Sequence, residues 1–277
     1  MRRLIWTLIC IAALSTAAFA QDDHCDACPV SVGYAVITAT NGFGPTGVGG
    51  GMIAFETLGL RSQVPALQAG VLPATMTNRL NVFANASIQV SRNVGVAITN
   101  PANTAATVTM TLRNASGTVT AVNSITLGPL QQTSKYISEF FANVVNILPD
   151  FAGTLTITSN TPVGVLAVLF NGTTFTSIPI TSLSTTSMLT QIAPNVGGNN
   201  GVLLPQFVAN GGWASQIVVI NNGSSPLTIR VDLFKQDGTP LVATLNHKSA
   251  SSYQNIVIAP GGTITLAPLD ANGFSDF

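Results

Sequence analysis

From Val32 onward, β-branched or aromatic residues alternate with Thr, Ser and Asn, and Gly or Pro interrupts this alternation at short intervals. Alternation with a period of two, broken regularly by turn residues, predicts an all-β protein of the sandwich type. The clearest predicted strands are 94–98, 107–112 and 153–158, and 114–117 has the composition of a hairpin loop between strands.

One stretch, 134–143, departs from this alternation. Apolar residues recur there at spacings of three and four, which is the spacing along one face of a helix. These residues are Tyr136, Ile137, Phe140 and Phe141. We therefore predict a short amphipathic helix that crosses one end of a sandwich and turns its aromatic side chains into the core.

The chain contains an internal repeat, in which 94–118 corresponds to 216–239. In both copies a strand runs into an Asn-rich turn, then into a second strand, and then into a Gly-Thr hairpin, so two similar modules are expected. The predicted divisions are a signal peptide (1–20), an N-terminal donor segment (21–58), a connector (59–77), a first sandwich (78–183), a linker (184–202) and an incomplete second sandwich (203–277).

The two modules do not end alike. After its helix, the first continues through 153–170, which has the pattern of two further strands. The second stops at Phe277, shortly after a predicted strand at 263–266. Two strands are therefore expected to be missing from the second module.

Segments like the missing strands occur near the start of the chain. The stretch 33–38 matches 153–158, and 49–55 matches 164–170. The order of the segments is thus that of a sandwich cut open, with its closing strands moved to the other end of the chain.

Several stretches together carry a resemblance to a known family. They are Leu80–Phe83 with Asn100-Pro101, Leu204–Phe207 with Gly211-Gly212-Trp213, and Val32–Val36. The chain resembles the tandem immunoglobulin-like β-sandwich repeats of secreted bacterial surface proteins. The resemblance implies two immunoglobulin-like sandwiches, to which the spacing in 134–143 adds one short helix. The chain departs from such arrays by being circularly permuted, in a way that resembles donor-strand-complemented pilus or filament subunits.

A sandwich that lacks two strands exposes an apolar groove and unpaired backbone edges, so the N-terminal strands are expected to fill it. The side chains expected to insert are Tyr34, Val36, Ile37, Ile53 and Phe55. The strands either fold back onto their own chain or enter a neighbouring subunit by β-augmentation. The second arrangement does not close on itself, so it predicts a head-to-tail homopolymer. The first predicts a closed monomeric adhesin or carbohydrate-binding protein for host or matrix glycans or proteins.

The first twenty residues predict export. Arg2 and Arg3 precede an apolar stretch, Leu4–Leu14, and small residues end at Ala20, which is the pattern of a secretory signal peptide. The apolar stretch is shorter than the ~20 residues that cross a membrane as a helix. We therefore expect an extracellular or cell-surface protein that has no membrane span after cleavage.

Two cysteines, Cys25 and Cys28, follow the predicted cleavage site. The oxidising environment outside the cell favours a disulfide between them, or across subunits, where it would staple the junction. His24 and the neighbouring Asp residues leave a metal site or a redox site as alternatives. No second Cys pair is present to complete a structural zinc site.

The charge content changes the picture by exclusion. The chain has 10 basic and 10 acidic residues, and charged residues make up 7% of it. A protein that binds nucleic acid through a basic patch needs more cations than this, so nucleic acid is not expected as a partner. Neutral Thr, Asn and Ser surfaces repel one another little, which suits packing of many copies.

Catalytic groups are sparse in the sequence. The two His residues, His24 and His247, lie far from any recognisable nucleophile motif, and His247 falls in a predicted hairpin. The acidic residues Glu56, Glu139, Asp150 and Asp232 are scattered, and Asp232 is expected to face solvent from a strand. We therefore predict no enzyme activity, no cofactor and no metal. Trp213, next to two glycines, is interpreted either as a buried plug or as a platform for stacking a sugar.

Overall fold

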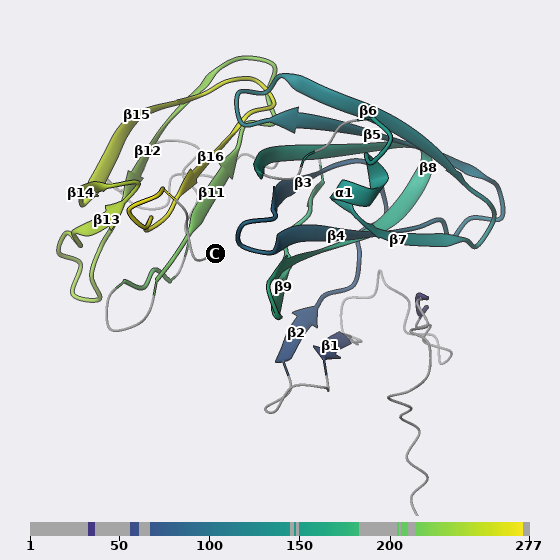
Figure 1. Ribbon diagram of the computed structural model, residues 1–277, viewed down its shortest axis with the longest axis horizontal. Helices are drawn as coiled ribbons and strands as arrows, with labels where there is room; N and C mark the ends of the chain where they lie inside the picture. Colours follow the sequence, from purple (N-terminus) through teal and green to yellow (C-terminus); the bar gives the residue numbers. More distant parts are fainter. Residues whose placement is uncertain are drawn as a thin grey trace, which may run out of the picture. The chain divides into compact units, whose positions relative to one another are not determined.

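The computed structural model describes residues 33–36, 56–60, 67–144, 147, 150–182, 204, 206–209 and 214–273. The chain divides into two compact units, 1–32 and 33–277, and every described residue belongs to the second unit. The described part is nearly all β with one short helix and sandwich-like sheets, which confirms the predicted fold class (Figure 1).

The elements follow one another in this order: β1 (Glu56–Leu60), β2 (Leu67–Val71), β3 (Thr77–Ser87), β4 (Arg92–Thr99), β5 (Ala106–Asn114), β6 (Val119–Leu127), β7 (Gln132–Tyr136), α1 (Ile137–Phe140), β8 (Asp150–Asn171), β9 (Thr174–Ile178), β10 (Thr181–Ser182), β11 (Ile217–Ile220), β12 (Leu227–Asp232), β13 (Ala243–Leu245), β14 (Lys248–Ala250), β15 (Ser252–Ile258) and β16 (Thr263–Leu266). Below, the first module is the part from β3 to β10, and the second module is the part from residue 204 to residue 273.

The strand β8 organises the first module. Its first half pairs with β3 and with β5, and its second half pairs with β4 and β9, so one strand belongs to both layers (Figure 1). The expectation of two strands in 153–170 is therefore wrong, because the chain continues without a reverse turn. In the ladders of the described strands, residues 160–162 have no partner, which suits Pro162 because proline has no N–H to donate.

The core of the first module follows the predicted alternation. Along β4, buried and half-buried positions alternate, and Val94, Val96 and Ile98 are fully buried. Leu112 of β5 and Leu155 of β8 belong to the same core and are also fully buried. Alternate side chains of each strand point into the core, so two layers of strands can pack with these apolar faces against each other.

The predicted helix is only partly correct. Residues 132–136 form β7, which pairs with β4, so the helix begins at Ile137 and not near residue 134. Pairing with β4 gives the backbone groups of 132–136 hydrogen-bond partners, which the first N–H groups of a helix would not have within that helix. The Tyr136 N–H, just before the helix, donates to the Glu139 carboxylate, 2.7 Å away. Phe140 and Phe141 are buried as predicted, whereas Tyr136 is exposed and its ring lies 5.3 Å from that of Phe170.

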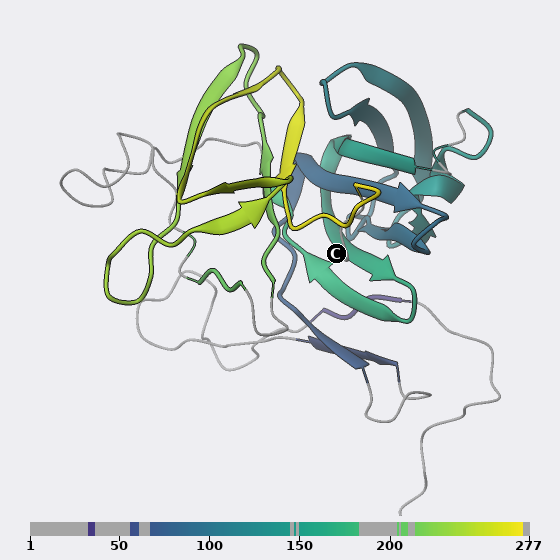
Figure 2. The same cartoon turned by 60° about the vertical axis from the view of Figure 1, so that its left-hand side comes forward.

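The described part of the second module, green to yellow in Figure 2, has three separate strand pairs, β11 with β16, β12 with β15, and β13 with β14. Its core is smaller than that of the first module and is centred on Leu245 and Tyr253. The buried Tyr253 hydroxyl lies 2.7 Å from the Ala243 carbonyl oxygen. Asn246 and His247 turn the β13–β14 hairpin with positive φ angles, so His247 lies in a hairpin as predicted.

The internal repeat recurs in the hydrogen bonds. The Asn100 amide donates to the carbonyl oxygens of three residues, Thr104, Leu127 and Gly128. The Asn221 amide donates to the corresponding three, Ser225, Ile258 and Ala259. The two asparagines therefore hold the same position, and they align β4 with β11, β5 with β12, β6 with β15 and β7 with β16.

Two further strands, β1 and β2, precede the first module and pair with each other as an antiparallel hairpin. The Ser177 hydroxyl of β9 donates to the Gly70 carbonyl of β2 over 2.8 Å, so this hairpin is docked. The expected boundary between donor segment and connector, at residue 58, falls inside β1. Among the described residues, no helix is long and apolar enough to cross a membrane.

Candidate strand-accepting site

The two modules bury corresponding side chains to different extents. In β5, the four inward-facing residues, Ala106, Val108, Met110 and Leu112, are all fully buried. The residues at the same positions of the second module are Leu227, Ile229, Val231 and Leu233. Of these only Leu233 is buried, and Leu227 is 39% exposed. The inner face of the second module is therefore open along β12.

The open face is bordered by two strand edges. In the first module, β4 and β5 each pair on one side with their neighbour and on the other side with β8. In the second module, β11 pairs with β16 and β12 with β15, and among the described strands nothing pairs with their other edges. Backbone N–H and C=O groups on such edges can accept a further strand.

A third part of the site is the segment 206–209. Its sequence neighbourhood, Leu204–Phe207, resembles Leu80–Phe83 of β3. Phe207 packs against the second core, but 206–209 forms no strand, whereas β3 pairs with β8 over most of its length. This segment also lines a pocket of about 430 Å³ together with Ser215 and Leu245.

Residues 33–36 of the predicted donor segment lie on the first module. Residues 33–36 are all exposed and belong to no strand, and Val36 is 73% exposed. The Tyr34 hydroxyl donates to the Leu130 carbonyl oxygen over 3.3 Å. The described part of the donor segment therefore does not fill the second module of its own chain.

The contact of Tyr34 repeats a contact between the modules. The Thr154 hydroxyl of β8 donates to the Gly261 carbonyl of the second module over 3.1 Å. Leu130 and Gly261 hold the same position in the β6–β7 and β15–β16 turns, and both have positive φ angles. By the sequence match of 33–38 with 153–158, Tyr34 also corresponds to Thr154. The two hydrogen bonds therefore match in both partners, because Tyr34 corresponds to the donor Thr154 and Leu130 corresponds to the acceptor Gly261.

A glycine supports this register. A Cβ on Gly153 would lie 1.9 Å from the Arg113 carbonyl oxygen, so only glycine lets β8 approach β5 at this point. Gly33 holds the corresponding place in the donor segment, yet no described residue of its own chain lies within 4 Å of a Cβ built there. The described residues of a single chain would therefore leave room for a larger residue at position 33.

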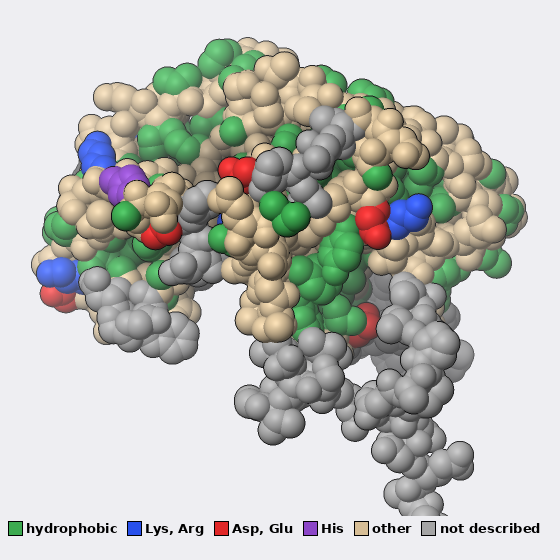
Figure 3. Space-filling model, viewed as in Figure 1, with side chains coloured by type: hydrophobic (Ala, Val, Ile, Leu, Met, Phe, Trp, Pro, Cys, Tyr) green, Lys and Arg blue, Asp and Glu red, His purple; other side chains and the backbone are tan. Residues whose placement is uncertain are grey.

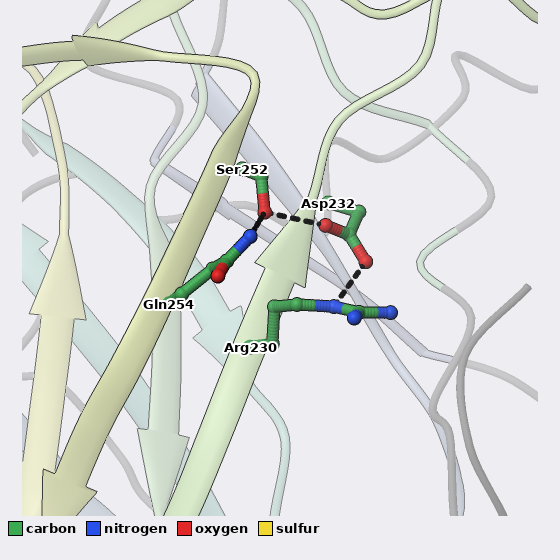
Figure 4. A network of polar contacts seen from close by, with 4 residues as sticks. All are labelled: Arg230, Asp232, Ser252 and Gln254. Carbon is green, nitrogen blue, oxygen red and sulfur yellow. Dashed lines mark hydrogen bonds and ion pairs between the residues drawn. The ribbon is translucent and has the colours of Figure 1, made fainter.

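The polar groups of the second module form surface networks. The Asp232 carboxylate accepts from the Arg230 Nε at 2.7 Å and from the Ser252 hydroxyl at 2.7 Å, and Gln254 donates to Ser252 (Figure 4). The Asp232 side chain is about one-quarter exposed (26%) and lies on β12, so it is more enclosed than predicted. Hydrogen bonds from the Thr239 hydroxyl and N–H lower the pKa of Asp237 below its usual value.

Among the described residues, the remaining charges do not gather into a site. On the face shown in Figure 3, charged side chains are few and scattered among polar and apolar ones. In the part of the chain that the structure describes, no group of three or more His, Cys, Asp or Glu residues could hold a metal ion.

Several predicted residues lie outside the described residues. They are the signal peptide (1–20), Cys25, Cys28, Ile37, Ile53, Phe55 and Trp213. The structure therefore places two of the expected inserting side chains, Tyr34 and Val36. The sequence analysis did not single out Leu130, whose carbonyl accepts from Tyr34. The signal that could have found it is its alignment with Gly261 in the internal repeat.

No protein-family model and no curated protein matches the chain. A crystal structure of the Thermotoga maritima protein 1070 is similar over 40% of this chain and 97% of its own, with 14% identity and a TM-score of 0.29. A crystal structure of the PBSX exported protein XepA is similar over 80% of this chain and 78% of its own, with 9% identity and a TM-score of 0.23. Both TM-scores are below 0.5, so neither likeness indicates a function for this chain.

Proposed function

We propose that this chain is a secreted structural subunit that polymerises head to tail into an extracellular filament by donor-strand complementation. The N-terminal segment of one subunit fills the open face of the second module of the preceding subunit. We also propose that its modules are immunoglobulin-like repeats of the kind found in secreted bacterial surface proteins, and that the protein has no enzymatic role.

The observation that carries the proposal is the repeated contact of Tyr34. Its hydrogen bond to Leu130, in the β6–β7 turn of the first module, reproduces the hydrogen bond of Thr154 to Gly261, in the corresponding turn of the second module. Thr154 belongs to β8, the strand for which the second module has no counterpart among the described residues. Tyr34 thus lies where it would lie if its segment were the β8 of a module that precedes the first one.

The positions of these contacts favour a neighbouring subunit over self-closure. Within the chain, the second module contacts the β5–β6 hairpin, where its Thr263 N–H donates to the Ala115 carbonyl. Tyr34 contacts the β6–β7 turn, which is at the other end of β6. That strand has 9 residues, or about 30 Å at ~3.3 Å per residue. Tyr34 of the donor segment therefore lies at the end of the first module that is opposite to the second module of its own chain.

The register predicts which donor side chains turn inward. Leu155 and Ile157 of β8 are buried in the core, whereas Thr156 is half-buried and faces away from it. By correspondence, Ala35 enters the accepting core and Val36 faces outward. Tyr34, two residues before Val36, faces outward in the same register. This differs from the sequence-based expectation, which placed both Tyr34 and Val36 among the inserting side chains.

The test is a matched pair of substitutions, Ala35→Asp and Val36→Asp, in the full chain. Both residues are exposed in the single subunit, so neither change should alter its folding. We expect Ala35→Asp to abolish filaments in electron microscopy, because it places a charge in an apolar core. Val36→Asp should still polymerise. Filaments of normal length from Ala35→Asp, or a native protein that stays monomeric at every concentration, would contradict the proposal.

A deletion separates the proposal from the closed-monomer alternative. Without 30–55, the subunit should keep its first module folded but fail to extend filaments. A closed monomer that uses these residues in its own core would instead become unstable or aggregate on the same deletion. Circular dichroism and light scattering distinguish the two results.

A further inference from the structure

The contact between the two modules of one chain is close and specific. The Thr263 N–H donates to the Ala115 carbonyl over 3.1 Å, and a Cβ on Gly117 would lie 2.1 Å from the Pro260 carbonyl oxygen. A Cβ on Gly261 would lie 3.0 Å from the Arg113 side-chain Cδ. The β5–β6 hairpin of the first module is therefore seated on the β15–β16 turn of the second.

The second module carries a copy of this hairpin. In the first, the Gly117 N–H donates to the Asn114 carbonyl over 2.9 Å, and in the second the Gly238 N–H donates to the Lys235 carbonyl over 3.0 Å. Gly117 and Gly238 share a φ of +82°. The copies also share the next backbone pair, Arg113 with Val119 and Phe234 with Pro240. In the copy, residues 234–240 are all exposed.

The first module carries a copy of the turn on which the hairpin sits. The Gln131 N–H donates to the Gly128 carbonyl over 3.2 Å, as the Gly262 N–H donates to the Ala259 carbonyl over 2.9 Å. Both turns have proline as their second residue. In this copy, Pro129, Leu130 and Gln131 are exposed. One chain thus has a hairpin and a turn that are seated on each other, called the occupied copies below, and a second hairpin and turn of the same shapes that are exposed. The exposed copies are called unoccupied because, among the described residues, no hairpin is seated on the turn, whose Leu130 carbonyl accepts from Tyr34.

The unoccupied copies differ from the occupied ones in a complementary way. Arg113 of the occupied hairpin is replaced by Phe234, and Gly261 of the occupied turn is replaced by Leu130. Phe234 is 50% exposed and Leu130 is 62% exposed. Leu130 also holds a φ of +57°, which glycine adopts easily and a bulky residue rarely does. Two exposed apolar side chains therefore stand at positions that are neighbours in the occupied contact.

We infer that the hairpin 234–240 of one subunit seats on the turn 128–132 of the next subunit, with Phe234 packed against Leu130. The partner of this surface is a second copy of the chain, and the contact reproduces between subunits the joint that links the modules within one subunit. The inference rests on the proposed polymerisation, since strand insertion with Tyr34 at Leu130 brings these two surfaces together. It adds a contact between folded modules that the inserted strand does not provide.

The test is a double-mutant cycle in the full chain, with Phe234→Ala, Leu130→Ala and both together. The measurement is the critical concentration for filament formation, obtained by sedimentation. We expect each single substitution to raise it about tenfold, a change typical of a central apolar contact. The double variant should be no worse than about tenfold relative to native protein, because either change already removes the pair.

Matched controls use exposed valines outside the contact, Val122→Ala in the first module and Val257→Ala in the second. Both should polymerise at the native critical concentration. Filaments whose critical concentration is unchanged by Phe234→Ala and Leu130→Ala, or changed additively, would overturn the inference while leaving strand insertion in place. A native chain that never polymerises would overturn both, so the two failures are distinguishable.

Discussion

The two modules share most of their strands, but the first has a complete core and the second, in its described part, does not. The Asn100 and Asn221 networks, the hairpins 114–118 and 235–239, and the paired strands around them coincide bond by bond. In the first module, β8 lies between β3 and β5 in one layer and between β4 and β9 in the other. The second module has no such strand among its described residues, and its inner face is half-exposed.

The difference shows what one strand contributes to a sandwich. Local features, such as turns, asparagine networks and two-strand pairs, form without β8. Complete burial of the core and a strand at the position of 206–209 are found only in the module that has β8. Under the proposed function, the second module would keep its framework in the free subunit and complete its core when a strand from a neighbouring subunit inserts.

The largest expected difference concerns leucines on corresponding strands. Leu112→Ala removes a fully buried side chain from the first module and should destabilise it by about 2–5 kcal/mol. Leu227→Ala, on the open face, should cost less than about 1 kcal/mol in the free subunit. Hydrogen exchange resolved along the sequence measures both modules separately. Equal costs would mean that the second core is already complete.

Glycines in register give the next effect. Gly153→Ala brings a Cβ against the Arg113 carbonyl and should destabilise the first module by about 3 kcal/mol. Gly33→Ala should leave the stability of the free subunit unchanged and block filament growth. Gly70→Ala, which also meets nothing within 4 Å, is the control and should polymerise normally. Normal filaments from Gly33→Ala would break the correspondence with Gly153.

The asparagine pair should behave more alike. Asn100→Ala and Asn221→Ala each leave buried carbonyl groups without a donor, which costs about 1–3 kcal/mol. The loss at Asn221 should be the smaller of the two because its module is more open to water. Urea denaturation followed module by module by hydrogen exchange provides the comparison. A larger cost at Asn221 would contradict the view of the second module as the less enclosed copy.

The smallest effect is the titration of Asp237 in the exposed hairpin. Bonds from Thr239 lower its pKa, so its contribution to hairpin order is present above the unfolded pKa and disappears as the pH falls through the folded one. The Thr239 amide resonance should therefore stay constant at neutral pH and shift below the usual aspartate range. Asp237→Asn should remove this titration. A midpoint at or above the usual aspartate value would show that the two hydrogen bonds do not form in solution.

Much of the fold could be predicted from the sequence, because alternation and turn residues are local signals. The strand β16 falls at the predicted positions, and the hairpin at 114–117 closes as expected. The continuity of β8 could not be predicted in this way, because Pro162 and its polar neighbours are typical of a turn between two strands. Its partners on either side are distant in sequence. The start of α1 was misplaced for the same reason, because pairing of β7 with β4 outweighs helical spacing.

The candidate site was predicted in outline but not in register. Repetition of strand patterns in the sequence predicted a donor segment and an incomplete second module. Whether Val36 points into the core or away from it depends on the register of the strand, because a shift of one residue moves every side chain to the opposite face. Leu130 and Phe234 were missed because single exposed apolar residues are common on protein surfaces. Their significance comes from their equivalents, Gly261 and Arg113, which are in contact.

The most direct test of the account is electron cryomicroscopy of the native protein recovered from the medium without denaturation. We expect filaments in which a strand lies between β12 and residues 206–209, and in which its density continues into the first module of the adjacent subunit. In that map, Gly33 should lie beside the Phe234 carbonyl of the accepting chain. A uniform population of monomers at every concentration, with the strand supplied by the same chain, would contradict the central claim.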